Sequence, residues 1–320
     1  MAGNTFTSND AKDLSIVIIS FNTVEYTRDC LTSVYENIGV LNAEIIVVDN
    51  DSQDGSVEMI RSEFPEAILI ENNDNRGFAA ANNQAFEICK ARLVLLLNSD
   101  TLVLGNVLQE SVLYMNNNPS VGAFGCRVLN TDRTVQRTCS QFPSLTNQLL
   151  QTLGVDRLSH PKFFGRYQMR HWDRDTEREV EVISGCYLIV RQEVLNTVGY
   201  LDENFFFFGE ETDWCRRIHR AGWLLKFSPV GEIIHHGSVS AWKLNERRDL
   251  LLGEAKVKLH LKYGGMAPAI LVFFLLFSFN FSRAVFWSLR SLIDSKSKKR
   301  ALHFRSVTRK NFSYWPGKLT

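Results

Sequence analysis

The feature that most constrains the fold is a fourfold alternation of short apolar runs and helical patterns in the N-terminal third. The apolar runs are too short to cross a membrane and suit buried strands; they lie at Leu14–Ser20, Glu44–Asp49, Ala67–Ile70 and Leu93–Leu97. Between and after them, apolar residues recur at helical spacing, as in Tyr26–Tyr35 and Phe78–Lys90. Strands that alternate with helices through short connections predict a parallel sheet with helices on both faces.

Polar residues directly follow three of these predicted strands. Asn22 follows the first run, Asp49 ends the second, and Asn98-Ser99-Asp100 follows the fourth. Each of them, taken alone, suits a turn or a helix cap. Because the carboxyl ends of parallel strands share one edge, where ligands bind in open α/β sheets, we expect Asn22, Asp49 and Asp100 to line one cleft. A carboxylate turn of this kind suits a hard divalent cation that also holds a phosphate.

Charge and motifs argue against several classes of function. The 36 basic and 35 acidic residues give a formal net charge of +1, so no global field points to nucleic acid. No GxGxxG follows the first predicted strand and no GxxxxGK[ST] occurs, which argues against dinucleotide-dependent dehydrogenases and P-loop enzymes. The six cysteines include no CxxC pair, which favours reduced, mostly buried thiols in a cytosolic compartment. The first dozen residues lack the pattern of a secretory signal.

The alternation stops after a predicted fifth strand at Val121–Cys126. Residues 130–180 show weak periodicity, and we expect them to form an excursion beside the cleft. Val180–Val190 resumes as a strand that is interrupted at Ser184-Gly185, which marks a bulge or a close approach to the backbone. An amphipathic helix then begins with Glu210-Glu211-Thr212-Asp213. Its carboxylates either complement the helix dipole or include a general base, and the local sequence leaves both alternatives open.

The C-terminal region holds an apolar segment with basic flanks. Within Met266–Leu289 the uninterrupted apolar run, Ala267–Phe279, is about 13 residues long, short of the ~20 that a membrane span needs. A single span would place one of the two basic flanks outside, against the positive-inside tendency. We therefore expect a helical segment that lies in the interface of the cytoplasmic leaflet. A buried core helix and a true span are the alternatives.

Six stretches follow one another in a characteristic order: SIVIISFN at Ser15–Asn22, IIVVDNDSQDGS at Ile45–Ser56, NNDNRGFAAANNQAF at Asn72–Phe86, LLLNSDT at Leu95–Thr101, ISGCYLIVRQEVLNTVGYLDENFFFFGEETDWCRRIHRAGW at Ile183–Trp223 and HHGSVS at His235–Ser240. Together they resemble family-2 glycosyltransferases, in the branch of rhamnosyltransferases and other bacterial polysaccharide-assembly enzymes. The resemblance implies an α/β GT-A fold, with a mostly parallel central sheet, helices on both faces and a C-terminal helical, membrane-associating tail. The expected domains are a disordered N-terminus over 1–12, a GT-A domain over 13–242 and the helical region over 243–320. Within the GT-A domain, residues 13–126 form the nucleotide-sugar-binding half and residues 127–242 the acceptor-binding half.

The resemblance also implies roles for particular residues. The nucleotide-sugar donor is expected to contact Asn22, Asp49, Asp51, Arg76, Gly77, Asn82, Asn98 and Ser99. The acceptor is expected to contact Ser184, Gly185, Glu210 and Trp214. Asp100 and His235 would bind Mg²⁺ or Mn²⁺, and Glu211 would be the general base. Two departures from the family pattern matter. Asn98 replaces an aspartate, which removes a charge near the metal, and Glu211 stands where many relatives have Asp.

The implied reaction is inverting transfer of a sugar, with rhamnose a candidate, from a nucleotide-diphosphate sugar to a glycan or polyprenyl-lipid-linked acceptor in cell-surface polysaccharide synthesis. We expect a cytoplasmic protein, peripheral on the inner leaflet of the cell membrane, with no nucleic-acid partner; a homo-oligomer is left open. The alternatives are a nucleotidyltransferase on a related fold and a non-catalytic glycan-binding relative. Phe21–Tyr26 holds neither Gly nor Lys, which argues against the first, and the presence of Asp49, Asp100 and Glu211 argues against the second.

Overall fold

The computed structural model describes residues 12–158, 160, 162–237 and 245–319, which form two compact units. The first unit holds the described residues up to Cys139, with Arg174–Asn204 and Trp214–His236. The second holds Ser140–Asp173, Phe205–Asp213 and the described residues from Gly237 onward. This division differs from the expected domains, because two segments of the expected GT-A domain group with the C-terminal helices. The expected disordered N-terminus, apart from its last residue, and the expected boundary at residue 242 lie outside the described residues.

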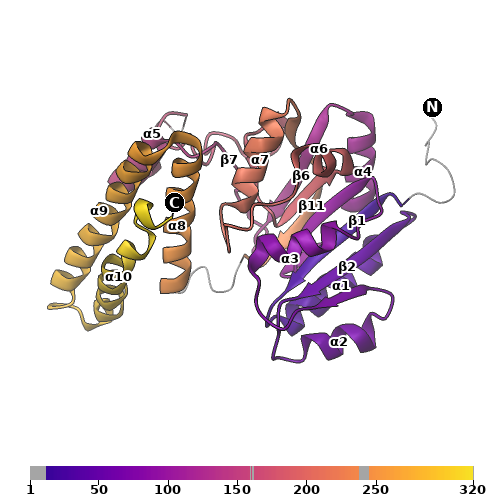
Figure 1. Cartoon of the computed structure of the whole chain (residues 1–320), viewed down its shortest axis with the longest axis horizontal. Helices are drawn as coiled ribbons and strands as arrows, with labels where there is room; N and C mark the ends of the chain where they lie inside the picture. Colours follow the sequence, from indigo (N-terminus) through magenta and orange to yellow (C-terminus); the bar gives the residue numbers. More distant parts are fainter. Residues whose placement is uncertain (1–11, 159, 161, 238–244, 320) are drawn as a thin grey trace. The chain divides into compact units, whose positions relative to one another are not determined.

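The first unit is built on a mixed sheet, which has nine strands in the part of the chain that the structure describes (Figure 1). The strand order is β3-β2-β1-β4-β10-β6-β11-β5, and β8 pairs with β11. The strands are β1 (Leu14–Ser20), β2 (Ala43–Asp49), β3 (Ile68–Glu71), β4 (Leu93–Asn98), β5 (Thr101–Val103), β6 (Val121–Leu129), β8 (Arg178–Glu179), β10 (Tyr187–Arg191) and β11 (Leu224–His235). Parallel pairing joins β3, β2, β1 and β4, and also β6 and β11, whereas β10 is antiparallel to both of its neighbours. The prediction of a mostly parallel sheet is therefore confirmed.

Helices cover both faces of this sheet, as the alternation predicts (Figure 1). They are α1 (Val24–Asn37), α2 (Ser56–Glu63), α3 (Gly77–Phe86), α4 (Val107–Asn117) and α6 (Gln192–Val198). Side chains at alternate positions of β1, such as Ile16 and Ile18, pack with Leu31 of α1 and Leu108 of α4 in one core cluster. On the other face α3 packs against β1 and β2. All six cysteines are free, and five of them are buried.

The predicted interruption at Ser184-Gly185 is confirmed, because β9 (Val182–Ile183) ends before it and β10 begins after it. A Cβ atom added at Gly185 would lie 3.3 Å from ring carbons of Phe78. This distance is tighter than ordinary van der Waals contact, so Gly185 allows the backbone to approach that ring closely. Strand β11, 12 residues long, ends at His235, where the last of the six sequence motifs begins.

The second unit is helical apart from its loops. Its helices are α5 (Leu145–Leu153), α8 (Glu246–Gly264), α9 (Met266–Arg290) and α10 (Lys298–Lys310), with short turns η1 (Val155–Arg157), η2 (Ser295–Ser297), η3 (Asn311–Tyr314) and η4 (Pro316–Lys318). Strand β7 (Cys139–Ser140) precedes them, and α7 (Glu210–Arg220) begins in this unit and continues into the first. Val257 of α8, Phe273 of α9 and Tyr314 belong to one buried cluster, which fixes these helices to one another.

Helix α9 is longer than its uninterrupted apolar run. It continues through Asn280 and Arg283 as a single helix of 25 residues, and by length and composition it is a candidate membrane span. The helix is therefore long enough for the true span that the sequence left as an alternative. Both polar positions have partners: Asn280 bonds to Asn311, and Arg283 lies over the ring of Phe279. Only 33% of the most apolar 18-residue stretch of α9 is buried.

Candidate active site

The ends of three parallel strands meet at one edge of the sheet, as predicted. In the pairing register, Ser20 of β1 lies beside Asp49 of β2, and Ile19 lies beside Asn98 of β4. Asn22 adopts a positive φ of 53° just beyond β1, a conformation that Asn tolerates better than most residues. Its N–H donates to Ser52 Oγ at 2.9 Å, and its Oδ1 accepts the N–H of Gln53 at 2.8 Å. The loops that follow β1 and β2 are thus bonded to each other.

Asp49 has the clearest sign of a missing partner in these loops. Its side chain is 1% exposed, and Oδ1 accepts the N–H of Ser52 at 2.8 Å. Oδ2 is buried and has no hydrogen-bond partner among the described residues. A buried carboxylate oxygen without a partner is costly, so this atom suits an N–H or O–H donor from a ligand. Asp51, with a φ of 68°, instead accepts from the side chain of Gln53 at 2.9 Å.

The third group of predicted donor residues lies at the start of α3. Arg76 precedes the helix and Gly77, with a φ of 83°, is its first residue. The carbonyl of Gly77 accepts from the side chain of Asn50 at 3.1 Å, which ties this turn to the loop after β2. Asn82 donates to the carbonyl of Phe78 at 2.8 Å, while its Oδ1 is buried with no partner among the described residues.

Asp100 and His235 are brought together by the pairing of two strands. Antiparallel pairing of β5 with β11 sets Thr101 beside His235, so that His235 Nε2 lies 3.2 Å from Asp100 Oδ1. The side-chain nitrogen of Asn98 lies 3.2 Å from the same Nε2. Burial alone would raise the pKa of Asp100, but the hydrogen bond and the charge of His235, together with the charge of His236, hold that pKa below its ordinary value.

The imidazole of His235 has a defined orientation. Its Nδ1 lies 2.7 Å from Gln136 Oε1, and a carbonyl oxygen at that distance accepts a proton held on Nδ1. In the protonated imidazole, Nε2 carries the proton that Asp100 accepts; in the neutral imidazole, a proton on Nδ1 leaves the lone pair on Nε2 for a cation. Gln136 was not identified from the sequence, because nothing in its neighbourhood marks it as a partner of a histidine 99 residues away.

The pair has the donor chemistry and spacing of two adjacent metal ligands. In an octahedral shell with bonds of ~2.1 Å, adjacent donors lie ~3 Å apart, close to the 3.2 Å between Asp100 Oδ1 and His235 Nε2. In the part of the chain that the structure describes, no group of three His, Cys, Asp or Glu side chains gathers around one point. A cation here would therefore need further oxygen donors from amides, water or a bound phosphate. Ser99, the residue before Asp100, has its Oγ 3.3 Å from Thr23 Oγ1.

Glu210 and Glu211 open α7 in the second unit. Glu210 is 4% exposed, and one carboxylate oxygen of each residue is buried without a hydrogen-bond partner among the described residues. Burial raises the pKa of Glu211, against the backbone N–H groups at the helix start. Burial, followed by the neighbouring charge of Glu211, raises the pKa of Glu210 well above its ordinary value. Raised carboxylate pKa values of this origin are a feature of acid and base sites.

Two other residues predicted to contact the acceptor, Ser184 and Trp214, have structural hydrogen bonds. Ser184 donates its N–H to the carbonyl of Thr138 at 2.8 Å, which fixes the break before β10. Trp214 is fully buried: it stacks on Phe86 at 5.5 Å, and its Nε1 donates to the carbonyl of Gly199 at 2.8 Å. Contact between Trp214 and an acceptor, as expected from the sequence, conflicts with this burial. Helical periodicity identifies a side chain that faces inward but does not say whether it faces a core or a cleft. Residues 238–240 of the HHGSVS motif lie outside the described residues.

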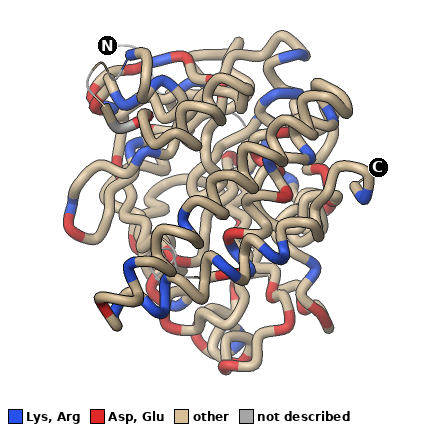
Figure 2. Tube along the Cα trace, turned by 90° about the vertical axis from the view of Figure 1, so that its left-hand side faces the viewer, with Lys and Arg blue, Asp and Glu red and all other residues tan. Residues whose placement is uncertain are grey.

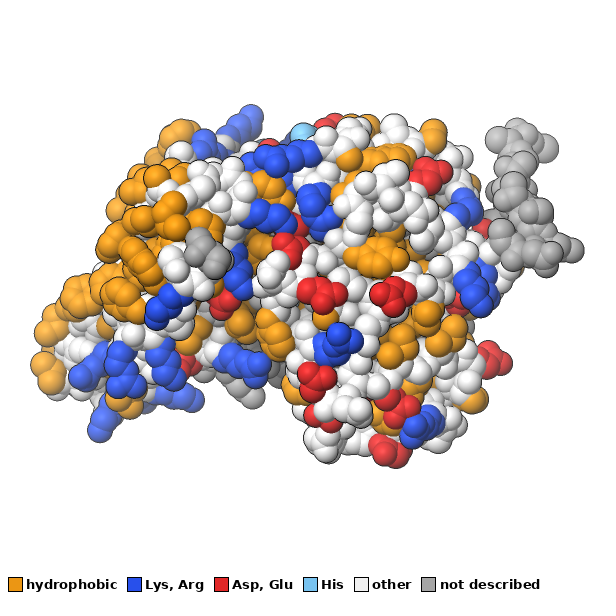
Figure 3. All heavy atoms as spheres, in the orientation of Figure 1, with side chains coloured by type: hydrophobic (Ala, Val, Ile, Leu, Met, Phe, Trp, Pro, Cys, Tyr) orange, Lys and Arg blue, Asp and Glu red, His pale blue; other side chains and the backbone are white. Residues whose placement is uncertain are grey.

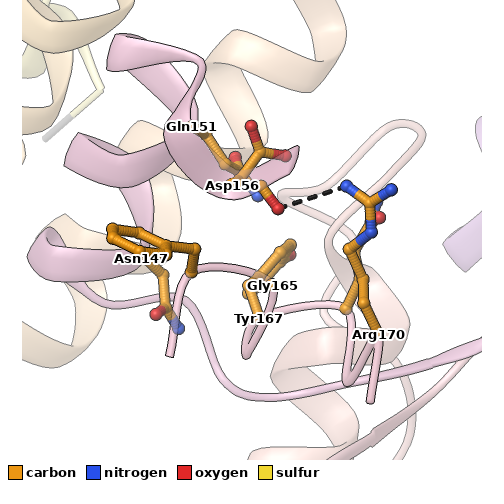
Figure 4. A pocket seen from close by; sticks show the side chains of 8 residues that line it. Asn147, Gln151, Asp156, Gly165, Tyr167 and Arg170 are labelled. Carbon is orange, nitrogen blue, oxygen red and sulfur yellow. Dashed lines mark hydrogen bonds between the residues drawn. The ribbon is translucent and has the colours of Figure 1, made fainter. Parts of the chain in front are cut away.

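The excursion after residue 140 carries a polar hollow that the sequence did not predict (Figure 4). Its walls include Asn147, Gln151, Asp156, Tyr167 and Arg170, and Arg170 donates to the carbonyl of Asp156 at 3.1 Å. Its volume of about 10 Å³ suits one water molecule rather than a sugar. Burial raises the pKa of Tyr167, and the charge of Glu211 contributes to that rise.

Comparison with known sequences shows the family. The sequence model described as "Glycosyl transferase family 2" matches residues 15–199, more than half of the chain. The chain therefore belongs to glycosyltransferase family 2, and its architecture is the GT-A fold. The matched region contains every predicted donor residue and Asp100, whereas Glu211 and His235 lie beyond its end.

Similar proteins include two curated glycosyltransferases and one solved structure. The N-acetylglucosaminyl-diphospho-decaprenol L-rhamnosyltransferase of Mycobacterium tuberculosis is 25% identical over 203 residues, which cover 60% of this chain and 66% of that protein. The low-salt glycan biosynthesis hexosyltransferase Agl10 of Haloferax volcanii is 24% identical, over 71% of this chain and 68% of that protein. The mannosyltransferase PcManGT of Pyrobaculum calidifontis, in complex with GDP-Man and Mn²⁺, superposes with a TM-score of 0.56 at 14% identity, covering 94% of this chain and 87% of that chain. The match therefore spans just under two thirds of the mycobacterial protein.

Proposed function

We propose that this protein is an inverting glycosyltransferase that moves a sugar from a nucleotide-diphosphate donor to a polyprenyl-linked glycan in cell-surface polysaccharide synthesis. The observation that carries the proposal is the Asp100–His235 pair at the carboxyl edge of the sheet, oriented by Gln136. The family and the names of both relatives support sugar transfer, and the name of the mycobacterial relative supports a lipid-diphosphate acceptor. Rhamnose is the first donor sugar to test.

In this proposal the nucleotide binds over the carboxyl ends of β1 and β2 and over the start of α3. Asp49 Oδ2 and Asn82 Oδ1 are buried acceptors without partners among the described residues, and they suit donor groups on the base and ribose. Asn22 and Asp51 shape the adjoining loops through their positive φ angles. Arg76 offers a charged guanidinium for the diphosphate, since Arg pairs well with phosphate oxygens.

Asp100 and His235 would hold Mg²⁺ or Mn²⁺, and Asn98 and Ser99 lie beside them with further oxygen atoms. When bound, the cation supplies a Lewis acid that stabilises charge on the departing diphosphate. The chain's own contribution is to hold these ligands in place: Gln136 sets the tautomer of His235, and the β5–β11 pairing sets its distance from Asp100.

Glu211 is proposed to accept the proton of the acceptor hydroxyl as its oxygen attacks the anomeric carbon and the bond to the diphosphate breaks. The transfer is a single displacement, so configuration inverts and no covalent intermediate forms on the protein. The raised pKa of Glu211 suits this role, because a general base works best when its pKa lies near the operating pH. Glu210, buried beside it, is proposed to contact the acceptor.

A lipid-linked acceptor lies in a membrane, and the second unit has a surface that suits contact with a membrane. The outward face of α9 is apolar (Figure 3), and its exposed side chains include Leu271, Phe274, Phe281, Val285, Phe286 and Leu289. An exposed apolar surface of this kind marks an interaction site. Exposed Lys and Arg begin at the last residue of α9 and continue along α10 (Figure 2): Arg290, Lys296, Lys298, Lys299, Arg300, Arg305 and Arg309. We propose that this face docks on an anionic cytoplasmic leaflet, where each basic residue adds about 1 kcal/mol.

The reaction is tested with a panel of nucleotide-diphosphate sugars, Mn²⁺ or Mg²⁺, and a polyprenyl-diphosphate-linked N-acetylglucosamine acceptor. We expect release of nucleoside diphosphate and a longer lipid-linked product with one donor, and loss of both after addition of a chelator. Product whose anomeric configuration matches that of the donor would contradict the inverting mechanism. Absence of transfer with every donor and both cations would contradict the enzyme assignment.

The membrane surface is tested by flotation with phosphatidylglycerol vesicles, with phosphatidylcholine vesicles as the neutral comparison. Replacing Lys296, Lys298, Lys299 and Arg300 by Gln is expected to weaken binding to the anionic vesicles only. The matched control replaces four exposed cations of the first unit by Gln: Arg61, Lys90, Arg133 and Arg137. Equal binding of both variants would remove α10 from the membrane surface. Retention of the intact protein on vesicles after alkaline carbonate would instead favour a true span by α9.

A further inference from the structure

The segment that carries Glu210 and Glu211 rests on α8, a helix that none of the sequence motifs includes. Phe205, which is 3% exposed, forms a buried cluster with Ala255 and Leu259 of α8. Phe208 and Tyr263 pack against the same cluster. The residues immediately before the two glutamates are therefore held by the C-terminal helices.

Gly209, directly before Glu210, allows a particularly close approach to α8. Its φ is 93°, a conformation that other residues rarely adopt. A Cβ atom added there would lie 3.0 Å from the Cβ of Ala255 and 3.0 Å from the ring of Phe205. Both the positive φ and the lack of room for a Cβ atom favour glycine at this position. The backbone at the start of α7 is therefore positioned by its contact with α8.

Asp213 adds a polar link between the same two helices. It lies two residues after Glu211 and has no exposed surface, and its N–H donates to the carbonyl of Gly209 at 2.8 Å in the first turn of α7. Its Oδ1 accepts the hydroxyl of Tyr263 at 2.6 Å and lies 2.6 Å from Lys262 Nζ. A buried carboxylate is stable only when it is paired and hydrogen-bonded, so Asp213 depends on the last turn of α8.

We infer that Lys262 and Tyr263 are positioning residues for Glu211, acting through Asp213. The inference rests on the proposed function, in which Glu211 is the base. The hydroxyl and the ammonium fix Asp213, Asp213 fixes the first turn of α7, and that turn carries the glutamate. The last turn of α8 thus positions the proposed base, and α9, which carries the proposed membrane surface, begins three residues after Tyr263.

The test measures kcat and the donor KM for Tyr263→Phe and Lys262→Met in the full-length protein. We expect kcat to fall roughly 10-fold or more for each variant, because small displacements of a catalytic group cost up to ~10²-fold. The donor KM should change less than twofold, since the donor residues belong to the first unit. Lys262→Arg keeps the ion pair and should recover most of kcat. The matched control is Lys258→Met, one turn earlier on α8, whose Nζ pairs with Glu254 of the same helix at 2.6 Å.

The outcomes separate this inference from the proposed function. If Glu211→Gln loses kcat while Tyr263→Phe and Lys262→Met keep it, the positioning role is wrong and the base assignment stands. If Glu211→Gln keeps full kcat, both are wrong. A rise in donor KM at constant kcat in the α8 variants would assign Lys262 and Tyr263 to donor binding instead. Should Lys262→Met fail to fold, Tyr263→Phe and Lys262→Arg still decide the question, because the first removes only the hydroxyl that contacts Asp213 and the second keeps the positive charge.

Discussion

The donor-side residues and the two glutamates of α7 are held in place by different kinds of structure. Asp49 and Asp100 lie at the ends of paired strands, where sheet register fixes them and neighbouring loops supply their hydrogen bonds. Glu210 and Glu211 lie on a segment packed against α8 of the C-terminal unit. If the proposed roles hold, binding of the donor and activation of the acceptor depend on separate parts of the chain. Each can therefore be impaired without the other.

The largest effect is expected from Glu211→Gln. The substitution keeps the size of the side chain and removes the base, so kcat should fall by ~10²–10⁴ while donor affinity stays nearly unchanged. Steady-state kinetics with calorimetry of donor binding checks both parts. The control is Glu193→Gln, an exposed glutamate in the first turn of α6. Loss of donor affinity at constant kcat would place Glu211 in the donor site and remove the contrast between the two regions.

Asp100→Ala is the corresponding change at the sheet edge. It removes the only carboxylate of Asn98-Ser99-Asp100, so donor binding should lose its dependence on Mn²⁺ and kcat/KM should fall by about 10²–10³. Calorimetry with a nucleotide sugar, with and without Mn²⁺, checks this result. Asp132→Ala, an exposed aspartate in a loop of the same unit, is the control. Unchanged metal dependence would exclude Asp100 as a ligand.

The pH dependence of kcat sharpens the comparison further. A general base acts in its deprotonated form, and burial raises the pKa of Glu211 above its ordinary value. As the pH falls, kcat should therefore begin to decrease at a higher pH than that of an exposed glutamate, ~4.3. Measuring kcat at saturating donor and cation gives the position of this acidic limb. A profile that stays flat down to the range of an exposed glutamate would show that the base has no raised pKa.

The smallest effect on activity is expected from Trp214→Phe. Loss of the indole hydrogen bond to Gly199 and of part of the stacking on Phe86 should lower the free energy of unfolding by about 1–3 kcal/mol. The acceptor KM should change less than twofold, because Trp214 is fully buried. Thermal unfolding and acceptor titration measure the two quantities. A large rise in acceptor KM with unchanged stability would restore Trp214 to the acceptor site.

Much of the first unit could be predicted from residues close in sequence. Apolar runs predicted β1 to β4, and parallel pairing predicted that the polar residues after them share one edge of the sheet. Gln136 and Lys262 could not be predicted this way. Each acts on a residue tens of positions distant, His235 and Asp213 respectively, and neither lies in a recognisable pattern. The uninterrupted apolar run also ends at Phe279, whereas α9 continues through Asn280 and Arg283, each of which has a partner.

The sequence by itself determined the alternation of strands and helices, the sheet edge with Asp49 and Asp100, and the family. Hydrophobic periodicity and strand-end polarity are local, and parallel pairing converts them into a shared edge with little further information. Only the tertiary structure decided that Trp214 is core, that Gln136 orients His235, and that the segment with Glu211 belongs with the C-terminal helices. These outcomes depend on close packing between distant segments, as at Gly209 and Ala255, and no local pattern records which distant surface a side chain will meet.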